Sequence, residues 1–180
     1  MYSNNLVYAN LNLELNKILH KVNTKGYSNL VFVCIGSSKM IGDSVGPIIG
    51  EILNNKLKST NIKVFGNLKN NVNSKNIYRT FKKIEKVYSK PYIISIDSAL
   101  SNSIKPGNVF ILKKGLIPGK ALKKKSIEIG NVSIRAIVGR DENNLVKNYY
   151  NLKNADYELI LKFSKNISNA ILKSIKFLNL

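Results

Sequence analysis

Two aspartates follow two apolar runs of the chain, and each stands among small residues. Asp43 lies in the segment Gly-Asp-Ser-Val-Gly-Pro, a short loop after the run Leu-Val-Phe-Val-Cys-Ile. Asp97 directly follows the run Pro-Tyr-Ile-Ile-Ser-Ile. If the two runs are neighbouring strands, the two carboxyl groups could share a proton or hold a water molecule. One pKa would then rise, and an acid would stand beside a base.

Simpler roles for both residues remain open. Asp43 could cap a helix, and Asp97 could form an Asx-turn after its strand. A divalent cation between the two carboxylates is a third possibility, but two carboxylates without a histidine make a weak site. Because the chain has no cysteine–histidine cluster, we expect neither a metal nor a cofactor.

The glycines around Asp43 do not form a phosphate loop. Such a loop needs Gly, four residues, and then Gly-Lys-Ser or Gly-Lys-Thr. Here five residues separate Gly36 from Gly42, and Asp43 stands where the lysine belongs. A carboxylate at that point would repel a nucleotide phosphate. The pattern therefore excludes a nucleotide site of this type.

Ser44 matches the pattern Gly-x-Ser-x-Gly but lacks the setting of a nucleophile. A nucleophilic serine of that kind sits at the very end of its strand, whereas eight residues separate Ile35 from Ser44. Its mechanism also needs a base, and the only histidine is His20, on a predicted N-terminal helix, where we expect it at the surface. Ser44 is expected to be a helix N-cap whose hydroxyl accepts a backbone N–H.

The apolar patterns predict alternating strands and helices in one domain, residues 1–180. Strands are predicted at 30–36, 62–68, 91–96 and 108–112, with one or two more within 126–139 around a Gly-Asn turn; helices are predicted at 10–22, from 44 onward, at 74–87 and at 154–178. This order indicates an α/β sandwich with a mostly parallel sheet. In such sheets, sites gather beyond the C-terminal ends of the strands, where both aspartates belong. Cys34, inside the first run, is expected to be a buried, inert thiol.

The net charge of +19 suggests a polyanionic partner such as nucleic acid, but its composition suggests a simpler origin. The excess is almost entirely lysine, the only arginines being Arg79, Arg135 and Arg140. Lysine accompanies abundant asparagine and isoleucine, which AT-rich coding favours. The longest apolar run is far shorter than the ~20 residues of a membrane span, and the first residues do not follow a secretory-signal pattern. We therefore expect a cytoplasmic protein with a solvated lysine surface and no membrane partner.

Several segments together resemble the YyaC family of sporulation proteins. They are VFVCIGSSKMIGDSVGPIIGEIL, VFGNL, IISIDSALS, KPGNVFILKKGLIPGKAL and IEIGNVSIRAIVG, which lie within residues 30–140. That family is similar to the germination protease of endospore formers and shares the fold of hydrogenase maturation proteases. The resemblance implies a three-layer α/β/α sandwich of the phosphorylase/hydrolase-like kind.

The resemblance also implies roles for the two aspartates. The germination protease carries one proposed catalytic aspartate in an Asp-x-x-Gly-Pro segment, which matches Asp43 with Gly46 and Pro47. It carries the other in an Ile-Asp segment, which matches Asp97. Hydrogenase maturation proteases add a downstream histidine that holds nickel, and this chain has no histidine after position 20. The pattern therefore resembles the germination protease more than the hydrogenase maturation proteases.

The function that this resemblance implies is peptide hydrolysis in a sporulating cell or forespore. One ionised aspartate would polarise a water molecule, and the other, protonated, would donate to the scissile carbonyl. Gly36, Ser37, Gly42 and Ser44 are the expected substrate-binding residues, where glycine lets the backbone approach the substrate. The expected substrates are proteins or peptides, including small spore proteins. The alternative is a non-catalytic binding module of the same fold that uses its basic surface for nucleic acid or an acidic protein partner.

Overall fold

The computed structural model describes residues 4–117 and 128–180, with side chains from residue 10 onward. Its centre is a five-stranded sheet in the order β2-β1-β3-β5-β4. The strands are β1 (Asn29–Cys34), β2 (Lys63–Phe65), β3 (Pro91–Ser101), β4 (Val109–Leu112) and β5 (Val132–Arg140). The first four in that order are parallel to one another, and β4 runs antiparallel to β5 at the edge. β1 and β3 are therefore neighbours, which is the condition for the two aspartates to meet.

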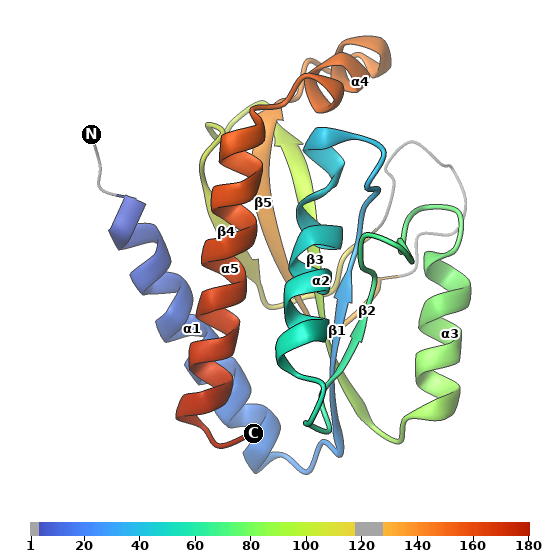
Figure 1. Cartoon of the computed structure of the whole chain (residues 1–180), viewed down its shortest axis with the longest axis vertical. Helices are drawn as coiled ribbons and strands as arrows, with labels where there is room; N and C mark the ends of the chain where they lie inside the picture. The colour runs from blue at the N-terminus through green and yellow to red at the C-terminus, as the bar shows by residue number, and fades with distance from the viewer. Residues whose placement is uncertain (1–3, 118–127) are drawn as a thin grey trace.

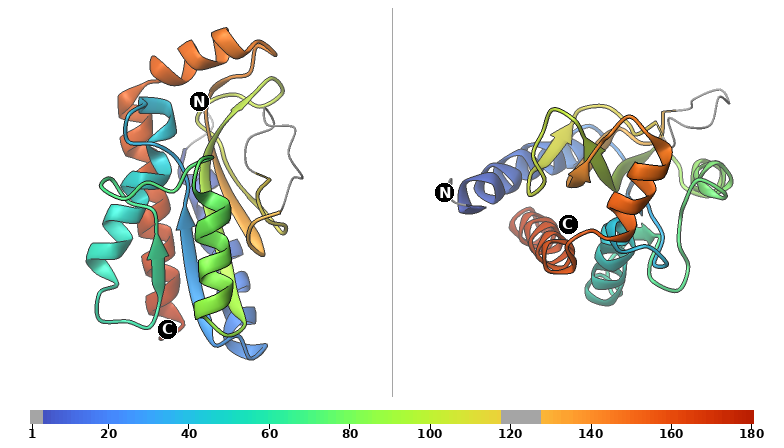
Figure 2. Two further views of the ribbon diagram at one scale, coloured as in Figure 1. Left: turned by 90° about the vertical axis from the view of Figure 1, so that its right-hand side faces the viewer. Right: turned by 90° about the horizontal axis from the view of Figure 1, so that it is seen from above.

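Helices cover both faces of this sheet (Figures 1 and 2). They are α1 (Asn4–Thr24), α2 (Val45–Lys56), α3 (Ile77–Val87), α4 (Leu145–Lys153) and α5 (Tyr157–Phe177), with a 3-10 turn, η1 (Ile41–Asp43), before α2. α1, α2 and α5 pack on one face, and α3 lies against the other. The predicted three-layer α/β/α sandwich is confirmed. No helix among the described residues is long and apolar enough to cross a membrane.

Alternation along the strands divides the core into two layers. In β1, Leu30, Phe32 and Cys34 join the large cluster with α1, α2 and α5. Val31 and Val33 point the other way and join the smaller cluster under α3. Cys34 is fully buried, and burial raises the pKa of its thiol, as expected of an unreactive core cysteine. A strand with apolar side chains on both faces reads as a continuous apolar run, which is why β1 was predictable.

α1 begins at Asn4 rather than at the predicted residue 10, and two further differences from the sequence prediction bear on the site. β3 does not end before Asp97 but continues to Ser101, because the long strand β5 pairs with it as far as Arg140 across a bulge at Ala99 and Leu100. No helix was predicted at α4, because it has no buried residue and so lacks an apolar stripe facing the core. The Pro118-Gly119 end of the family motif and the start of the predicted 126–139 segment lie outside the described residues.

The junction between β1 and α2 depends on a close approach of two backbones. Gly46, in the first turn of α2, lies so near the end of β1 that a Cβ atom would overlap the carbonyl oxygen of Ile35. Pro47 follows within the same first turn, where its missing N–H leaves no hydrogen bond unmade. This contact determines where α2 begins, and with it the position of Asp43.

We predict that Gly46→Ala destabilises the protein although alanine is the better helix former. Overpacking of this kind typically lowers the free energy of unfolding by about 1–3 kcal/mol. The matched control is Asn55→Ala at an exposed position of the same helix, which should leave the thermal midpoint unchanged or slightly raised. Equal midpoints for Gly46→Ala and the wild type would contradict this account of the junction.

Candidate functional site

The end of β1 runs alongside Asp97. Cys34 pairs with Ile96 in the parallel ladder, and the Ile35 N–H donates to the Ile96 carbonyl at 2.7 Å. The chain then leaves the sheet at Gly36, whose N–H donates to the Val72 carbonyl at 2.8 Å. The site therefore begins where β1 ends beside its longer parallel neighbour β3, towards the C-terminal ends of the strands, as expected for an open α/β sheet.

The loop from Gly36 to Asp43 folds back on itself. The Ser37 N–H donates to the backbone carbonyl of Asp43 at 2.8 Å, which closes the loop. Ser38 is held from outside, because its N–H and its hydroxyl both donate to Asn71 Oδ1, at 3.0 and 3.1 Å. Gly36 has φ +141°, and a Cβ there would overlap the Asp43 carbonyl oxygen. Glycine is thus required for the return that brings Asp43 back to the end of β1.

Ser44 stands at the predicted N-cap position of α2, but its hydroxyl does not do what was predicted. It accepts no backbone N–H; it donates to the Ile41 carbonyl at 2.7 Å. The reason is that η1 runs directly into α2, so Ser44 has helical dihedrals (φ −94°, ψ −5°) and its hydroxyl reaches back three residues. Ser44 is buried and thereby fixes the turn that carries Asp43.

Gly42 faces another part of the protein. A Cβ at this position would lie 2.8 Å from the Leu152 carbonyl oxygen and 3.1 Å from the Ala155 Cβ. The end of α4 therefore packs directly on η1. This packing accounts for a glycine at position 42 without any substrate, while Ser37 stays half-buried at the start of the loop.

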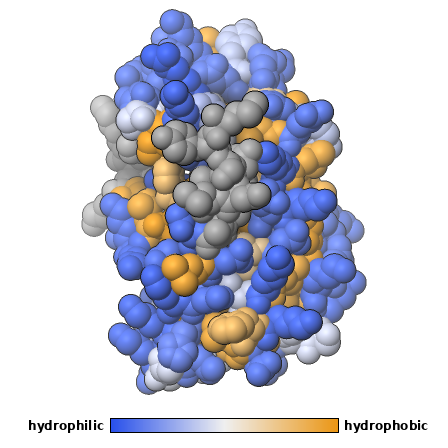
Figure 3. Space-filling view, turned by 90° about the vertical axis from the view of Figure 1, so that its left-hand side faces the viewer, coloured by the Kyte–Doolittle hydropathy of each residue, from blue (hydrophilic) through white to orange (hydrophobic). Residues whose placement is uncertain are grey.

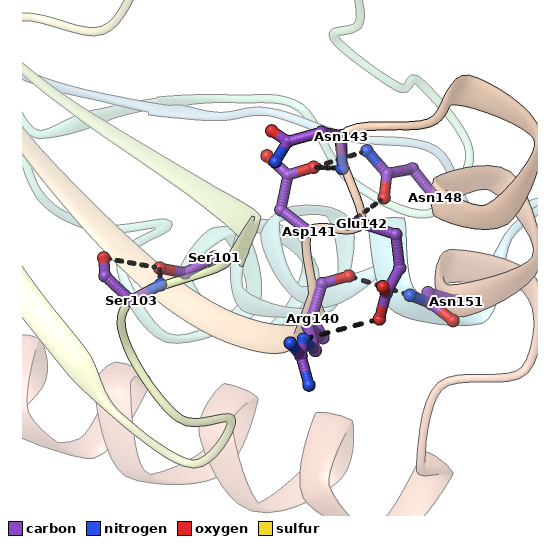
Figure 4. A network of polar contacts seen from close by, with 8 residues as sticks. All are labelled: Ser101, Ser103, Arg140, Asp141, Glu142, Asn143, Asn148 and Asn151. Atoms are coloured by element: carbon purple, nitrogen blue, oxygen red, sulfur yellow. Dashed lines mark hydrogen bonds and ion pairs between the residues drawn. The ribbon is translucent and has the colours of Figure 1, made fainter.

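α4 is hydrogen-bonded to the end of β5 and to the residues that follow it (Figure 4). The Asn148 side chain donates to Asp141 Oδ1 at 2.8 Å and accepts from the Glu142 N–H at 2.9 Å. The Asn151 side chain donates to the Arg140 carbonyl at 2.8 Å. These bonds connect β5 through α4 to η1, so the turn that bears Asp43 is held from both sides.

Asp97 lies within β3 and shares its sheet face with Ile93 and Ser95, the face that α3 partly covers. Arg135 of β5 is its direct partner in the parallel register. Arg135 was not among the predicted site residues. Its sequence signal is modest: it is the one charged residue within the otherwise apolar and small segment Val-Ser-Ile-Arg-Ala-Ile-Val-Gly.

The two aspartates are half-buried, and their carboxyl groups interact. Burial raises the pKa of Asp43 to about 6, against a smaller lowering by the Ser37 N–H. Burial also raises the pKa of Asp97 to about 8, with a further rise from the Asp43 carboxylate; Arg135 and the Ser98 N–H act in the opposite direction. Near neutral pH, the pair therefore holds one ionised carboxylate, on Asp43, and one protonated carboxyl, on Asp97.

The side chains around Asp43 and Asp97 offer few ligands for a metal ion. Within residues 4–117 and 128–180, no group of three or more His, Cys, Asp or Glu side chains is arranged to hold a metal ion. His20 is exposed on α1. That the protein needs no metal stays a prediction, and the arrangement offers acid–base chemistry from the aspartates alone.

We predict that Asp97→Asn stabilises the protein increasingly as pH rises. Because the folded-state pKa of about 8 exceeds the ordinary value near 3.9, the folded protein binds this proton more tightly than the unfolded chain does. The resulting stability is complete below about pH 4 and is lost as pH rises through about 8. Asparagine cannot ionise, so the midpoint difference between variant and wild type should grow by several degrees from about pH 5 to about pH 9.

The matched control is Asp156→Asn, which removes the same charge from an exposed helix N-cap and keeps a good cap. Its midpoint difference should show no comparable growth over that range. A difference for Asp97→Asn that is constant with pH would contradict the assigned pKa.

Comparison with known proteins places the chain in a family. It is similar to a Bacillus subtilis (strain 168) protein named "Uncharacterized protein YyaC", with 28% identity over 142 residues that cover 79% of this chain and 67% of the relative. The family model described as "Protein of unknown function (DUF1256)" matches residues 2–170, which include β1, both aspartates and most of α5. The chain therefore belongs to the DUF1256 family.

Proposed function

We propose that this protein is a peptidase-like hydrolase whose catalytic groups are Asp43 and Asp97. The observation that carries the proposal is the coupling of two half-buried carboxyl groups, one on η1 after β1 and one within the neighbouring parallel strand β3, with pKa values of about 6 and about 8. Groups whose environments separate their pKa values in this way serve as a base and an acid at the same pH.

The proposed reaction begins with a water molecule between the carboxyl groups and a peptide carbonyl. The Asp43 carboxylate takes a proton from the water molecule while the water oxygen bonds to the carbonyl carbon. At the same time, Asp97 gives its proton to the carbonyl oxygen. The resulting tetrahedral diol then breaks its C–N bond. Asp43 passes its proton to the leaving amine, and Asp97 recovers a proton from one hydroxyl of the diol as the C=O double bond forms again. The products are a carboxylic acid and an amine, and both aspartates end in their starting states.

The substrate in this proposal is an extended peptide segment that lies beside the loop at Gly36 and Ser37. The resemblance to the germination protease supports a protein substrate in the sporulating cell, with small spore proteins as the first candidates. The resemblance also supports the assignment of the catalytic groups, since Asp43 and Asp97 match the two proposed catalytic aspartates of the germination protease. The two glycines of the loop, by contrast, are already accounted for by contacts inside the protein.

We predict that Asp43→Asn and Asp97→Asn each lower cleavage of an unfolded spore-protein substrate by at least about a hundredfold, the low end for loss of general acid–base catalysis. Asparagine keeps the volume and some hydrogen bonding but cannot exchange the proton. Asp156→Asn, exposed and distant in the sequence, is the matched control and should retain full activity. Product release is followed by mass spectrometry, with EDTA present because no proposed step uses a metal.

Full cleavage by both folded Asn variants would contradict the mechanism, and complete loss of activity in EDTA would contradict its independence of metal. The first outcome would leave the non-catalytic alternative. What favours that alternative is the charge of +19, and the face of the molecule seen in Figure 3 is largely hydrophilic, with separated hydrophobic patches. Binding of nucleic acid by such a surface would fall steeply with salt.

We predict a bell-shaped pH dependence of kcat/KM with its maximum near pH 7. Activity should fall below about 6, where the base becomes protonated, and above about 8, where the acid loses its proton. Because the carboxyl groups interact, the two limbs report the pair rather than single residues. A profile that stays flat from about pH 5 to about pH 9 would contradict the assignment of base and acid.

A further inference from the structure

Arg135 places a positive charge next to the aspartate pair. It lies opposite Asp97 in the parallel register of β3 and β5, so both side chains leave the same face of the sheet. Its charge acts on the Asp97 carboxyl and lowers that pKa, although burial and Asp43 together raise it further. The arginine thus belongs to the same group of side chains as the two proposed catalytic residues.

One donor of the Arg135 guanidinium is buried without a partner in the part of the chain that the structure describes. Arg135 Nε is buried and has no hydrogen-bond partner among the described residues. Arg135 forms no ion pair within 4 Å in the described part of the chain, whereas Arg140 pairs with Glu142 at 3.5 Å. Residues 1–3 and 118–127 contain no aspartate or glutamate, so they bring no further carboxylate to it. A buried donor without a partner lowers stability, so a ligand that accepts from it is favoured.

The residue type is also informative. Only three of the 29 basic residues are arginine, although lysine would supply the same charge. Arginine differs in its rigid, planar fork of N–H donors, which matches the two oxygens of a carboxylate. Because Arg135 is half-buried while its Nε is buried, the accessible part of the side chain lies on its other atoms.

We propose that Arg135 binds a carboxylate of the substrate, either an acidic side chain or a peptide C-terminus, and so makes the site selective for peptides with a carboxylate close to the scissile bond. The selective cleavage of such peptides rests on the proposed function, whereas the binding of a carboxylate by Arg135 does not. The net charge of +19 acts in the same direction, since a basic protein attracts acidic peptides over a distance. Protonation of Asp97 near neutral pH leaves Asp43 as the ionised carboxylate of the pair, so Arg135 is not already neutralised by its register partner.

Binding is tested by NMR with three alanine-based pentapeptides. The first has a central Glu and blocked ends, the second has Gln instead, and the third has Gln and a free C-terminal carboxylate. With three arginines in the chain, the Nε–H signals are few and can be assigned from Arg135→Lys and Arg79→Gln. The Glu peptide, the free-carboxylate peptide or both should shift the Arg135 signal and bind roughly tenfold more tightly than the blocked Gln peptide.

Arg135→Gln should remove this preference, and Arg135→Lys should keep only part of it, because lysine retains the charge but not the fork. Arg79→Gln, at an exposed position of α3, is the matched control for charge and should leave the preference intact. Which carboxylate peptide binds more tightly distinguishes a side-chain site from a C-terminus site. Equal binding of all three peptides, or an unchanged preference in Arg135→Gln, would overturn the proposal.

The same peptides separate this inference from the peptidase proposal. If the wild type binds the carboxylate peptides selectively but cleaves none, the role of Arg135 stands and the hydrolytic function falls. If peptides are cleaved with equal kcat/KM whether they carry Glu or Gln, and binding shows no preference either, the peptidase stands and the role of Arg135 falls.

Discussion

The organisation of this site depends on the confinement of two carboxyl groups beside the end of β1, that of Asp43 on η1 and that of Asp97 within the adjacent strand β3. Water would normally keep both ionised, but partial burial and mutual repulsion make a double negative charge unfavourable. The proton that relieves the repulsion is what allows one carboxyl to act as an acid beside a base. Strand order creates this confinement, since adjacent parallel strands deliver their C-terminal ends to the same edge of the sheet.

Much of the surrounding structure serves to hold Asp43 at that edge. Gly36 lets the loop turn back, Gly46 lets α2 approach β1, and Gly42 lets α4 pack on the turn between them. Each is a place where a side chain would meet backbone atoms, so the arrangement tolerates little displacement. The raised pKa values of the carboxyl pair imply that it lowers stability at neutral and alkaline pH. An element that lowers stability while its neighbourhood is tightly packed is typical of a functional site.

The sequence predicted those parts of the fold that burial determines. β1 and the first part of β3 are buried on both faces, and α2 and α5 carry apolar stripes, so their residue patterns reveal them. The two aspartates were identified as candidates because they follow such runs. α4 was missed because it buries no residue, and the extension of β3 was missed because a partner strand, not local composition, supports it.

Other features depended on geometry that no local pattern contains. The hydroxyl of Ser44 donates backwards because η1 continues into α2, which its own sequence neighbours do not indicate. Arg135 became a site residue only through its register with Asp97. Whether Asp43 and Asp97 interact at all depended on strand order, which the sequence left open and the resemblance to the germination protease only implied.

The central claim is that Asp43 and Asp97 share one negative charge near neutral pH, and it can be measured directly. The chain has four aspartates, so their side-chain carboxyl carbons can be followed one by one in a carbon-13 NMR titration. The account predicts that Asp43 and Asp97 titrate near 6 and near 8, and that removing either carboxyl by Asn substitution changes the titration of the other. Titration of both groups at the ordinary value near 3.9, each indifferent to the other, would contradict it.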